Sequence, residues 1–233
     1  MLKIDNMTKY YQDKKAVDGL SLEVQPGELF GFIGHNGAGK TTTLKAISGI
    51  LDFEQGDIFI NGASIKTDPL QAKRNIAYIP DNPDIYSYMK GIDYLNFIAD
   101  VYGVPMEKRK ELITTYGEQF EILEVLNMPV SGYSHGMKQK LAIISALVHS
   151  PKVLILDEPF VGLDPKASHT LKQLMRQLCD DGSCIFFSTH VLEVAQSICD
   201  KIAIIKQGKL VVQGDTQQVC SEKSLEEIFL ELV

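Results

Sequence analysis

Eight consecutive residues carry the pattern G-x-x-x-x-G-K-T, which is the spacing of a loop that binds nucleotide phosphates. They are Gly34, His35, Asn36, Gly37, Ala38, Gly39, Lys40 and Thr41. Glycines leave backbone N–H groups free to surround phosphate oxygens. The lysine reaches the β- and γ-phosphates, and the hydroxyl after it binds Mg²⁺. We therefore predict that this segment, called here the phosphate loop, binds a nucleotide with Mg²⁺, together with Thr42 directly after it.

The sequence predicts a strand before the phosphate loop and a helix after it, which is the arrangement that such a loop requires. Leu29–Ile33 is a short apolar run that predicts a buried strand. After the loop, Leu44, Ile47 and Leu51 recur at helical spacing. A strand, a glycine-rich loop and a helix N-terminus favour an anionic ligand, because the helix dipole places partial positive charge there. The alternative, a glycine-rich turn with a chance lysine, does not account for this order.

Two acidic residues follow a second apolar run. Val153–Leu156 predicts a buried strand, and Asp157 and Glu158 come directly after it. Ligands of a parallel sheet bind beyond the carboxyl ends of its strands, so we expect both acids beside the phosphate loop. Phosphoryl transfer to water needs a metal ligand and a group that orients or deprotonates the water. We assign Asp157 to Mg²⁺ and Glu158 to the general base, rather than to a solvated acidic turn.

A histidine ends a third apolar run. His190 follows Ile185–Thr189 and is therefore also expected at the carboxyl end of a strand. Its imidazole has the reach to hydrogen-bond the γ-phosphate, or to hold the water and Glu158 in place. A histidine in a turn is more often a polar surface residue. The other two clusters favour a catalytic role here.

Composition restricts the class of protein. The 233 residues suit one domain or two closely joined subdomains, and 45% are hydrophobic. Lys and Arg total 23 against 30 Asp and Glu, so the net charge of −7 argues against a general nucleic-acid binder. The four cysteines form no C-x-x-C pair, and three of them lie in or beside apolar segments. We expect free thiols in a reducing cytosol and no metal site among them.

The N-terminal residues do not resemble a signal peptide, and no stretch reaches the ~18 apolar residues of a membrane span. We therefore expect a soluble chain, with any membrane span supplied by a partner.

Strand and helix signals divide the chain into three parts. The first 80 residues or so contain mostly strand patterns, residues 84–149 have helical spacing, and the remainder alternates between strand and helix. Alternation predicts a parallel sheet covered on both faces. We expect one domain over 1–233 with an α/β fold. Its P-loop nucleotide hydrolase core, with an N-terminal antiparallel β-subdomain, comprises 1–83 and 150–233, and the inserted helical subdomain comprises 84–149. Pro165 is well placed as the first residue of a helix to Asp180.

An ordered set of motifs carries a family resemblance. After the phosphate loop come Tyr133-Ser134-His135-Gly136-Met137-Lys138-Gln139, the acidic strand end at Asp157-Glu158, Gly162-Leu163-Asp164 and Ser188-Thr189-His190. In this order the chain resembles the ATP-binding subunits of ABC transporters over essentially its whole length. The motifs correspond to the family's signature, acidic strand end, D-loop and switch histidine. The Met-Lys-Gln signature and compact length resemble bacterial exporter-type subunits.

The resemblance implies partners as well as a site. Two such subunits face each other head to tail around two ATP molecules. Ser134 and Gly136 of one subunit contact the γ-phosphate held by the phosphate loop of the other. Tyr11 matches the aromatic residue that stacks on adenine, with Tyr10 as a substitute and a plain strand-edge tyrosine as the alternative. The implied partners are a membrane-spanning permease and a second ATPase subunit, identical or related. The implied location is the cytoplasmic face of the cell membrane.

Two positions depart from the family pattern. His135 stands where the signature usually has glycine, which affects affinity or pH response. Asp81 stands where a glutamine usually approaches Mg²⁺ and the water. A carboxylate suits a hard cation, so we predict that Asp81 contacts Mg²⁺ through water. In the alternative, Asp81 turns away and Asn82 makes the contact.

Three rival functions are weaker. An ABC ATPase acting on nucleic acid or ribosomes would carry long coiled coils or two cassettes, and the chain has neither. A small-molecule kinase would need an arginine-rich lid where this chain carries the signature. A non-enzymatic nucleotide sensor would not need Glu158 and His190.

Overall fold

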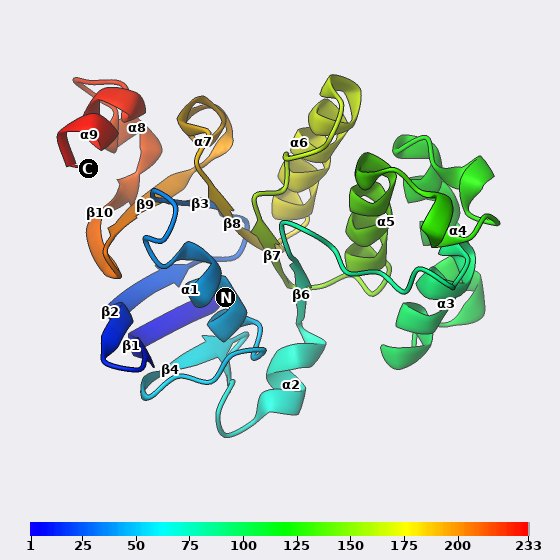
Figure 1. The fold of residues 1–233 in the computed structure, drawn as a ribbon, viewed down its shortest axis with the longest axis horizontal. Helices are drawn as coiled ribbons and strands as arrows, with labels where there is room; N and C mark the ends of the chain where they lie inside the picture. The colour runs from blue at the N-terminus through cyan, green and yellow to red at the C-terminus, as the bar shows by residue number, and fades with distance from the viewer. Residues whose placement is uncertain (233) are drawn as a thin grey trace. The chain divides into compact units, whose positions relative to one another are not determined.

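The computed structural model describes residues 1–232, which form two compact units. The first unit comprises Met1–Tyr78, Lys152–Pro159 and the chain from Met175 onward. The second comprises Ile79–Pro151 and Phe160–Leu174. Figure 1 shows the chain coloured from its N-terminus to its C-terminus. The residues predicted as a helical subdomain, 84–149, all belong to the second unit, which also includes a segment after the acidic strand end.

A six-stranded sheet is the centre of the first unit, in the order β10-β9-β3-β8-β7-β6 (Figure 1). The four adjacent strands β9, β3, β8 and β7 run parallel to one another, and β10 is antiparallel to β9. Every residue of β3, β7 and β8 is buried, as expected of a parallel sheet that is covered on both faces. The predicted parallel sheet is therefore confirmed. The strands are β3 (Leu29–Ile33), β6 (Ile76–Ile79), β7 (Val153–Asp157), β8 (Cys184–Thr189), β9 (Lys201–Lys206) and β10 (Lys209–Asp215).

A second, four-stranded sheet is antiparallel and has the order β2-β1-β4-β5. Burial alternates along the second half of β2, so one face of the sheet is buried and the other exposed. Its buried face shares one core with Phe30 and Phe32 of β3 and with Leu44 of the following helix. The predicted antiparallel β-subdomain is confirmed. Its strands are β1 (Leu2–Tyr11), β2 (Lys14–Val24), β4 (Gln55–Ile60) and β5 (Ala63–Ser64).

The helices of the first unit differ from prediction mainly at their ends. Helix α1 (Lys40–Ile47) follows the phosphate loop, but it stops a turn before Leu51 because Gly49 adopts a left-handed φ of 65°. Helix α2 (Pro69–Arg74) was not predicted, although Asp68 caps it and proline is its first residue. The other helices of this unit are α7 (Leu192–Ile198), α8 (Thr216–Val219) and α9 (Leu225–Leu232), and α6 (Pro165–Asp180) is divided between the two units.

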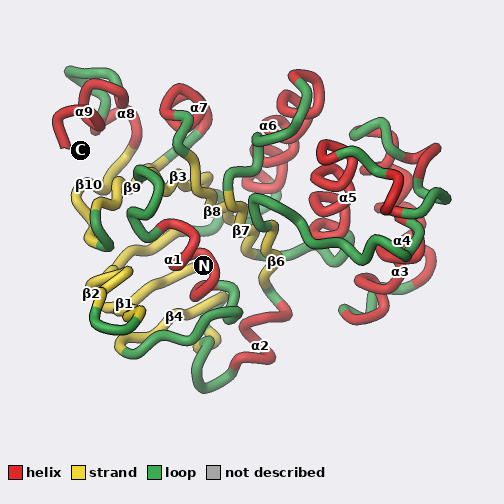
Figure 2. Tube along the Cα trace, viewed as in Figure 1, coloured by secondary structure: helices red, strands yellow, loops and turns green. Residues whose placement is uncertain are grey.

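The second unit is helical, as Figure 2 shows in red. Its helices are α3 (Gly91–Val101), α4 (Met106–Gln119) and α5 (His135–Leu147), with short 3-10 turns at Leu123–Val125 and Val130–Gly132. Helix α5 is almost entirely buried from Leu141 onward. Among residues 1–232, no helix has the length and apolar character that crossing a membrane requires.

All four cysteines are free thiols, as predicted. Cys179, Cys184 and Cys199, called here the three buried thiols, lie in the core, and Cys220 is partly exposed. Burial raises the pKa of Cys179 to about 11 and that of Cys184 to about 12. Burial also raises the pKa of Cys199. The three buried thiols therefore stay protonated and unreactive at neutral pH.

Candidate active site

The phosphate loop connects a buried strand to an uncapped helix. β3 ends at Ile33, and α1 begins at Lys40 with Gly39 as its N-cap. Gly39 has a φ of 112° and provides no side-chain cap, so no side chain occupies the position from which an anion would meet the helix N-terminus. A Cβ at Gly39 would lie 2.6 Å from the carbonyl oxygen of Ala16. Glycine is therefore required here both by conformation and by space.

Backbone hydrogen bonds hold the middle of the loop, one within the loop and one from the turn between β9 and β10. The amide of Ala38 donates to His35 O at 3.1 Å, and the amide of Gly208 donates to Ala38 O at 2.8 Å. His35 Nδ1 lies 2.7 Å from Asn36 O. Gly37, with a φ of 80°, has no atom within 4 Å of a Cβ placed on it, so the space beside its Cα is open. The loop is therefore preformed, with its glycine tip free.

Lys40 is folded back over the loop. Its ammonium group donates to Gly34 O at 2.6 Å and lies 3.7 Å from Glu158 Oε1. The lysine is only 6% exposed. A buried ammonium beside a helix N-terminus gives the loop a fixed positive charge in the position where an anionic phosphate would bind.

Asp157 joins the phosphate loop to the neighbouring strands. The hydroxyl of Thr41 donates to Asp157 Oδ2 at 2.8 Å, and the hydroxyl of Ser188 donates to Asp157 Oδ1. Asp157 and Ser188 are register partners at the carboxyl ends of β7 and β8. The expected proximity of the acidic strand end and the phosphate loop is therefore present within the first unit.

The donor set around Asp157 suits Mg²⁺. Its carboxylate is 1% exposed and has no ion-pair partner within residues 1–232, although a buried charge is costly without a counterion. Carboxylate and hydroxyl oxygens are the hard ligands that Mg²⁺ takes, and this ion is usually bound by one or two protein groups plus substrate phosphates. Asp157 and Thr41 would hold it, and it would neutralise phosphate charge.

Glu158 and His190 form a pair directly after this point. His190 Nδ1 lies 2.9 Å from Glu158 Oε2, and the His190 amide also donates to that oxygen at 3.3 Å. The glutamate side chain is 15% exposed and the histidine 57%. One carboxylate oxygen of Glu158 thus contacts His190, and the other lies near Lys40. The glutamate is oriented from both sides and remains accessible to water.

Tyr11 lies at the end of β1 and is half exposed, with Lys9 Nζ 5.7 Å from its ring centroid. It pairs with Lys14, at the start of the strand that brings Ala16 against Gly39 of the loop. Tyr10 pairs with Lys15 instead. Tyr11 is therefore at the end of the β1–β2 pair that adjoins the phosphate loop.

Thr42, which was also predicted as a nucleotide-binding residue, lies half-buried in the first turn of α1.

The predicted signature residues lie in the second unit. Ser134 is the N-cap of α5, and its hydroxyl accepts a hydrogen bond from the Met137 amide at 3.2 Å. Gly136 packs so closely that a Cβ there would lie 2.8 Å from Gly162 O. The ring of His135 packs against Gly162 as well. The signature and the D-loop thus contact each other.

Asp81 is exposed in a loop of the second unit. Its Oδ1 accepts a hydrogen bond from the amide of the next residue, Asn82, at 2.9 Å. The bond is local, so the side chain is turned onto its own backbone. Its proposed contact with Mg²⁺ stays a prediction.

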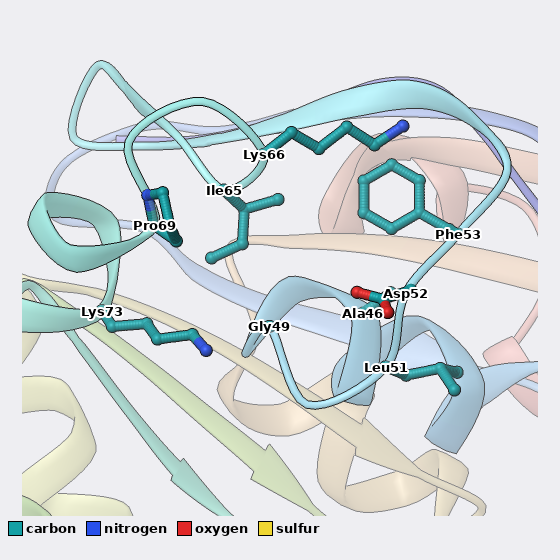
Figure 3. A pocket seen from close by; sticks show the side chains of 9 residues that line it. All are labelled: Ala46, Gly49, Leu51, Asp52, Phe53, Ile65, Lys66, Pro69 and Lys73. Atoms are coloured by element: carbon teal, nitrogen blue, oxygen red, sulfur yellow. The ribbon is translucent and has the colours of Figure 1, made fainter.

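Sequence reasoning missed two features. One is the contact of Ser188 with Asp157 and Glu158, because the sequence analysis named Ser188 only as part of a strand and of the motif that ends at His190. The other is a hollow of about 400 Å³ at the far end of α1 from Lys40 (Figure 3). Phe53 and Ile65 form part of its apolar lining, and Lys66 Nζ lies 4.2 Å from the Phe53 ring centroid. Its lining residues come from two separate stretches of the chain, 46–53 and 65–73, so no local pattern indicated it.

The chain is similar to known proteins in both sequence and fold. The family profile described as ABC transporter matches residues 17–161. The ABC transporter ATP-binding protein YhaQ of Bacillus subtilis is 40% identical over 94% of this chain and 72% of its own length. The solved ATP-binding subunit of an ABC transporter is 32% identical, with a TM-score of 0.96 over 100% of this chain and 99% of its own. A third similar protein is cbiO1 of Clostridium perfringens, part of the ABC transporter complex cbiONQ. It is 27% identical, with a TM-score of 0.81 over 99% of this chain and 95% of its own.

Proposed function

This chain belongs to the ABC transporter family, and from that premise we propose that it binds MgATP on the phosphate loop and powers transport through a separate membrane-spanning partner. It is an ATP-binding, ATP-hydrolysing subunit. The observation that carries the proposed site is the hydrogen bond from Thr41 to Asp157, with Lys40 beside Glu158. Both contacts lie within the first unit, and they join the phosphate loop to the carboxylate that we propose for Mg²⁺ and to the proposed base.

Binding uses groups that are already in place. Loop N–H groups and the first turn of α1 donate to the phosphate oxygens. The ammonium of Lys40 exchanges its contact with Gly34 O for the β- and γ-phosphates. Tyr11 stacks on adenine from the β1–β2 end. We expect a Tyr11→Ala variant to bind ATP less tightly while its unfolding temperature stays close to that of the parent chain.

Hydrolysis depends on the Glu158–His190 pair. Glu158 accepts a proton from water, whose oxygen forms a bond to the γ-phosphorus while the bond from that phosphorus to the β–γ bridging oxygen breaks. His190 holds one carboxylate oxygen of the glutamate, so the other stays oriented. Asp157 and Thr41 would hold Mg²⁺, which would neutralise charge on the phosphates. Asp81 would add a water-mediated contact to the metal.

The working state is a head-to-tail pair of subunits around two ATP molecules. Ser134 and the amide of Gly136 contact the γ-phosphate held by the other subunit, which is a second copy or a related chain. Their place at the N-terminus of the 13-residue helix α5 supports this, because such a site favours an anion. Size-exclusion chromatography of Glu158→Gln at saturating MgATP should show a dimer. Monomer alone would contradict the paired arrangement, since ligand bound across an interface favours association.

The membrane-spanning partner contacts residues 81–94 of the second unit. Tyr86 and Tyr88 are 50% and 80% exposed, their ring centroids lie 5.8 Å apart, and Phe97 is 45% exposed beside Tyr86. Exposed aromatic side chains are enriched at protein interfaces. The subunit would thereby sit on the cytoplasmic face of the cell membrane. The Met-Lys-Gln signature supports an exporter-type system.

The proposal is tested by purifying the chain from its native membrane and measuring MgATP hydrolysis. ATP turnover together with a co-purified membrane protein would support it. Turnover that depends on added ribosomes or DNA would support the nucleic-acid rival, and a phosphorylated metabolite would support the kinase rival.

A further inference from the structure

Ser188 touches both acidic residues of the site. Ser188 is fully buried in β8, which pairs with β7. Asp157 is the last residue of β7, and Glu158 is in the turn directly after it. The Ser188 hydroxyl donates to Asp157 Oδ1 and accepts a hydrogen bond from the Glu158 amide at 3.1 Å. From this geometry we infer that Ser188 is a positioning residue for ATP hydrolysis, which fixes the metal-side and the water-side carboxylates relative to each other. The inference rests on the proposed function.

On the Asp157 side, Ser188 helps to fix the plane of the carboxylate. Each oxygen of this carboxylate accepts one hydroxyl, Oδ1 from Ser188 and Oδ2 from Thr41. Rotation of the carboxylate out of this plane would break both bonds. The serine therefore holds one carboxylate oxygen toward Thr41, and the pair of oxygens proposed for Mg²⁺ is formed before nucleotide binds.

On the Glu158 side, Ser188 stabilises a backbone conformation that glutamate rarely adopts. Glu158 has a left-handed φ of 49°, which is unfavourable for a residue with a side chain. The Glu158 amide donates to two oxygens of Ser188, the backbone carbonyl oxygen at 3.2 Å and the side-chain hydroxyl oxygen. This turn directs the glutamate side chain to Lys40 and His190. Strained backbone of this kind persists only where its surroundings hold it.

The chemistry of a hydroxyl explains why serine is suited to this position. A hydroxyl has one proton to donate and lone pairs to accept, so it serves an acceptor and a donor at the same time. Alanine does neither, and the thiol of cysteine is weak in both roles. Threonine carries the same hydroxyl with one additional methyl group. The three substitutions therefore separate hydrogen bonding from side-chain volume.

The test compares Ser188→Ala, Ser188→Cys and Ser188→Thr with Ser145→Ala, in the full-length chain. Ser145 is a matched control because it is also buried, and its hydroxyl bonds Ala142 O in α5. We expect Ala and Cys at position 188 to lower kcat by roughly 10- to 100-fold, as small misplacements of reacting groups do. The KM for ATP should change less than about 3-fold, and Ser188→Thr should retain kcat within about 3-fold.

A binding measurement gives a readout that does not depend on turnover. Equilibrium binding of trinitrophenyl-ATP is measured at increasing Mg²⁺ and again in EDTA. Ser188→Ala should need more Mg²⁺ to reach the affinity of the parent chain and should match it in EDTA. In a Glu158→Gln background, Ser188→Ala should lower single-turnover hydrolysis less than about 3-fold, because residues that act through one another are not additive.

Three results would overturn the inference. They are an unchanged kcat in Ser188→Ala, equal losses in Ser188→Ala and Ser145→Ala, and full additivity with Glu158→Gln. If Ser188→Thr fails to fold, as thermal melting would reveal, Ser188→Cys keeps the comparison, because it matches the volume without the hydrogen bonds. Absence of ATP hydrolysis in the parent chain would instead contradict the proposed function.

Discussion

Replacing Lys40 by alanine removes the ammonium group that the structure holds over the phosphate loop. The lysine is 6% exposed and donates to Gly34 O at 2.6 Å, so it is already positioned before nucleotide binds. A hydrogen bond to a charged group contributes about 1.5–3 kcal/mol, and 1.4 kcal/mol is tenfold in affinity, so loss of one such bond raises the Kd for ATP roughly 10- to 140-fold. Contacts to two phosphates would increase the loss.

Isothermal titration calorimetry with MgATP measures this change directly. Lys45→Ala is the matched control, because Lys45 is an exposed lysine in the last turn of the same helix. We expect the control to bind ATP like the parent chain and to melt at a similar temperature. An unaltered Kd in a folded Lys40→Ala variant would refute the assignment of the phosphate loop.

Three further predictions address other parts of the molecule. At neutral pH, a thiol reagent should modify Cys220 in the native chain and the three buried thiols only after unfolding. Burial shields the three buried thiols and raises their pKa, which lowers their thiolate fraction, so four fast-reacting thiols would contradict this prediction. Asp81→Ala should raise the Mg²⁺ concentration for half-maximal turnover, with partial recovery in Asp81→Gln; an unchanged Mg²⁺ dependence would leave Asp81 a plain loop residue. Cysteines placed at Tyr86 and Tyr88 should cross-link to the membrane partner, and failure at both positions in an intact complex would mean that these rings only cover the helical core.

Long elements with a strong pattern were predictable from the sequence. Helix α6 begins at Pro165 and ends at Asp180 as expected, because proline has a favourable φ and no N–H to lose at the first helical position. β3 and β8 were recognised as continuous apolar runs. Helices α2 and α8 were missed, since six and four residues are too few to show a helical period. The apolar residue Leu51 extended the predicted α1 too far, because Gly49 turns the chain first.

The site was predictable where it follows from sheet topology. Thr41 and Asp157 are 116 residues apart in sequence, yet a parallel sheet brings the ends of their strands together. The contact of Ser188 with both acids was not predictable. It depends on the register of β7 against β8 and on the left-handed turn at Glu158, and neither has a local sequence signal.

The central claim, that this chain hydrolyses ATP with Glu158 as the base, is tested most directly by phosphate release from Glu158→Gln at saturating MgATP. Glu193→Gln is the control, since Glu193 is an exposed glutamate in the first turn of α7. A general base contributes ~10²–10⁴-fold, so phosphate release should fall by about that factor while ATP remains bound. The control should release phosphate at the parent rate. Release at the parent rate from Glu158→Gln with ATP bound would contradict the account.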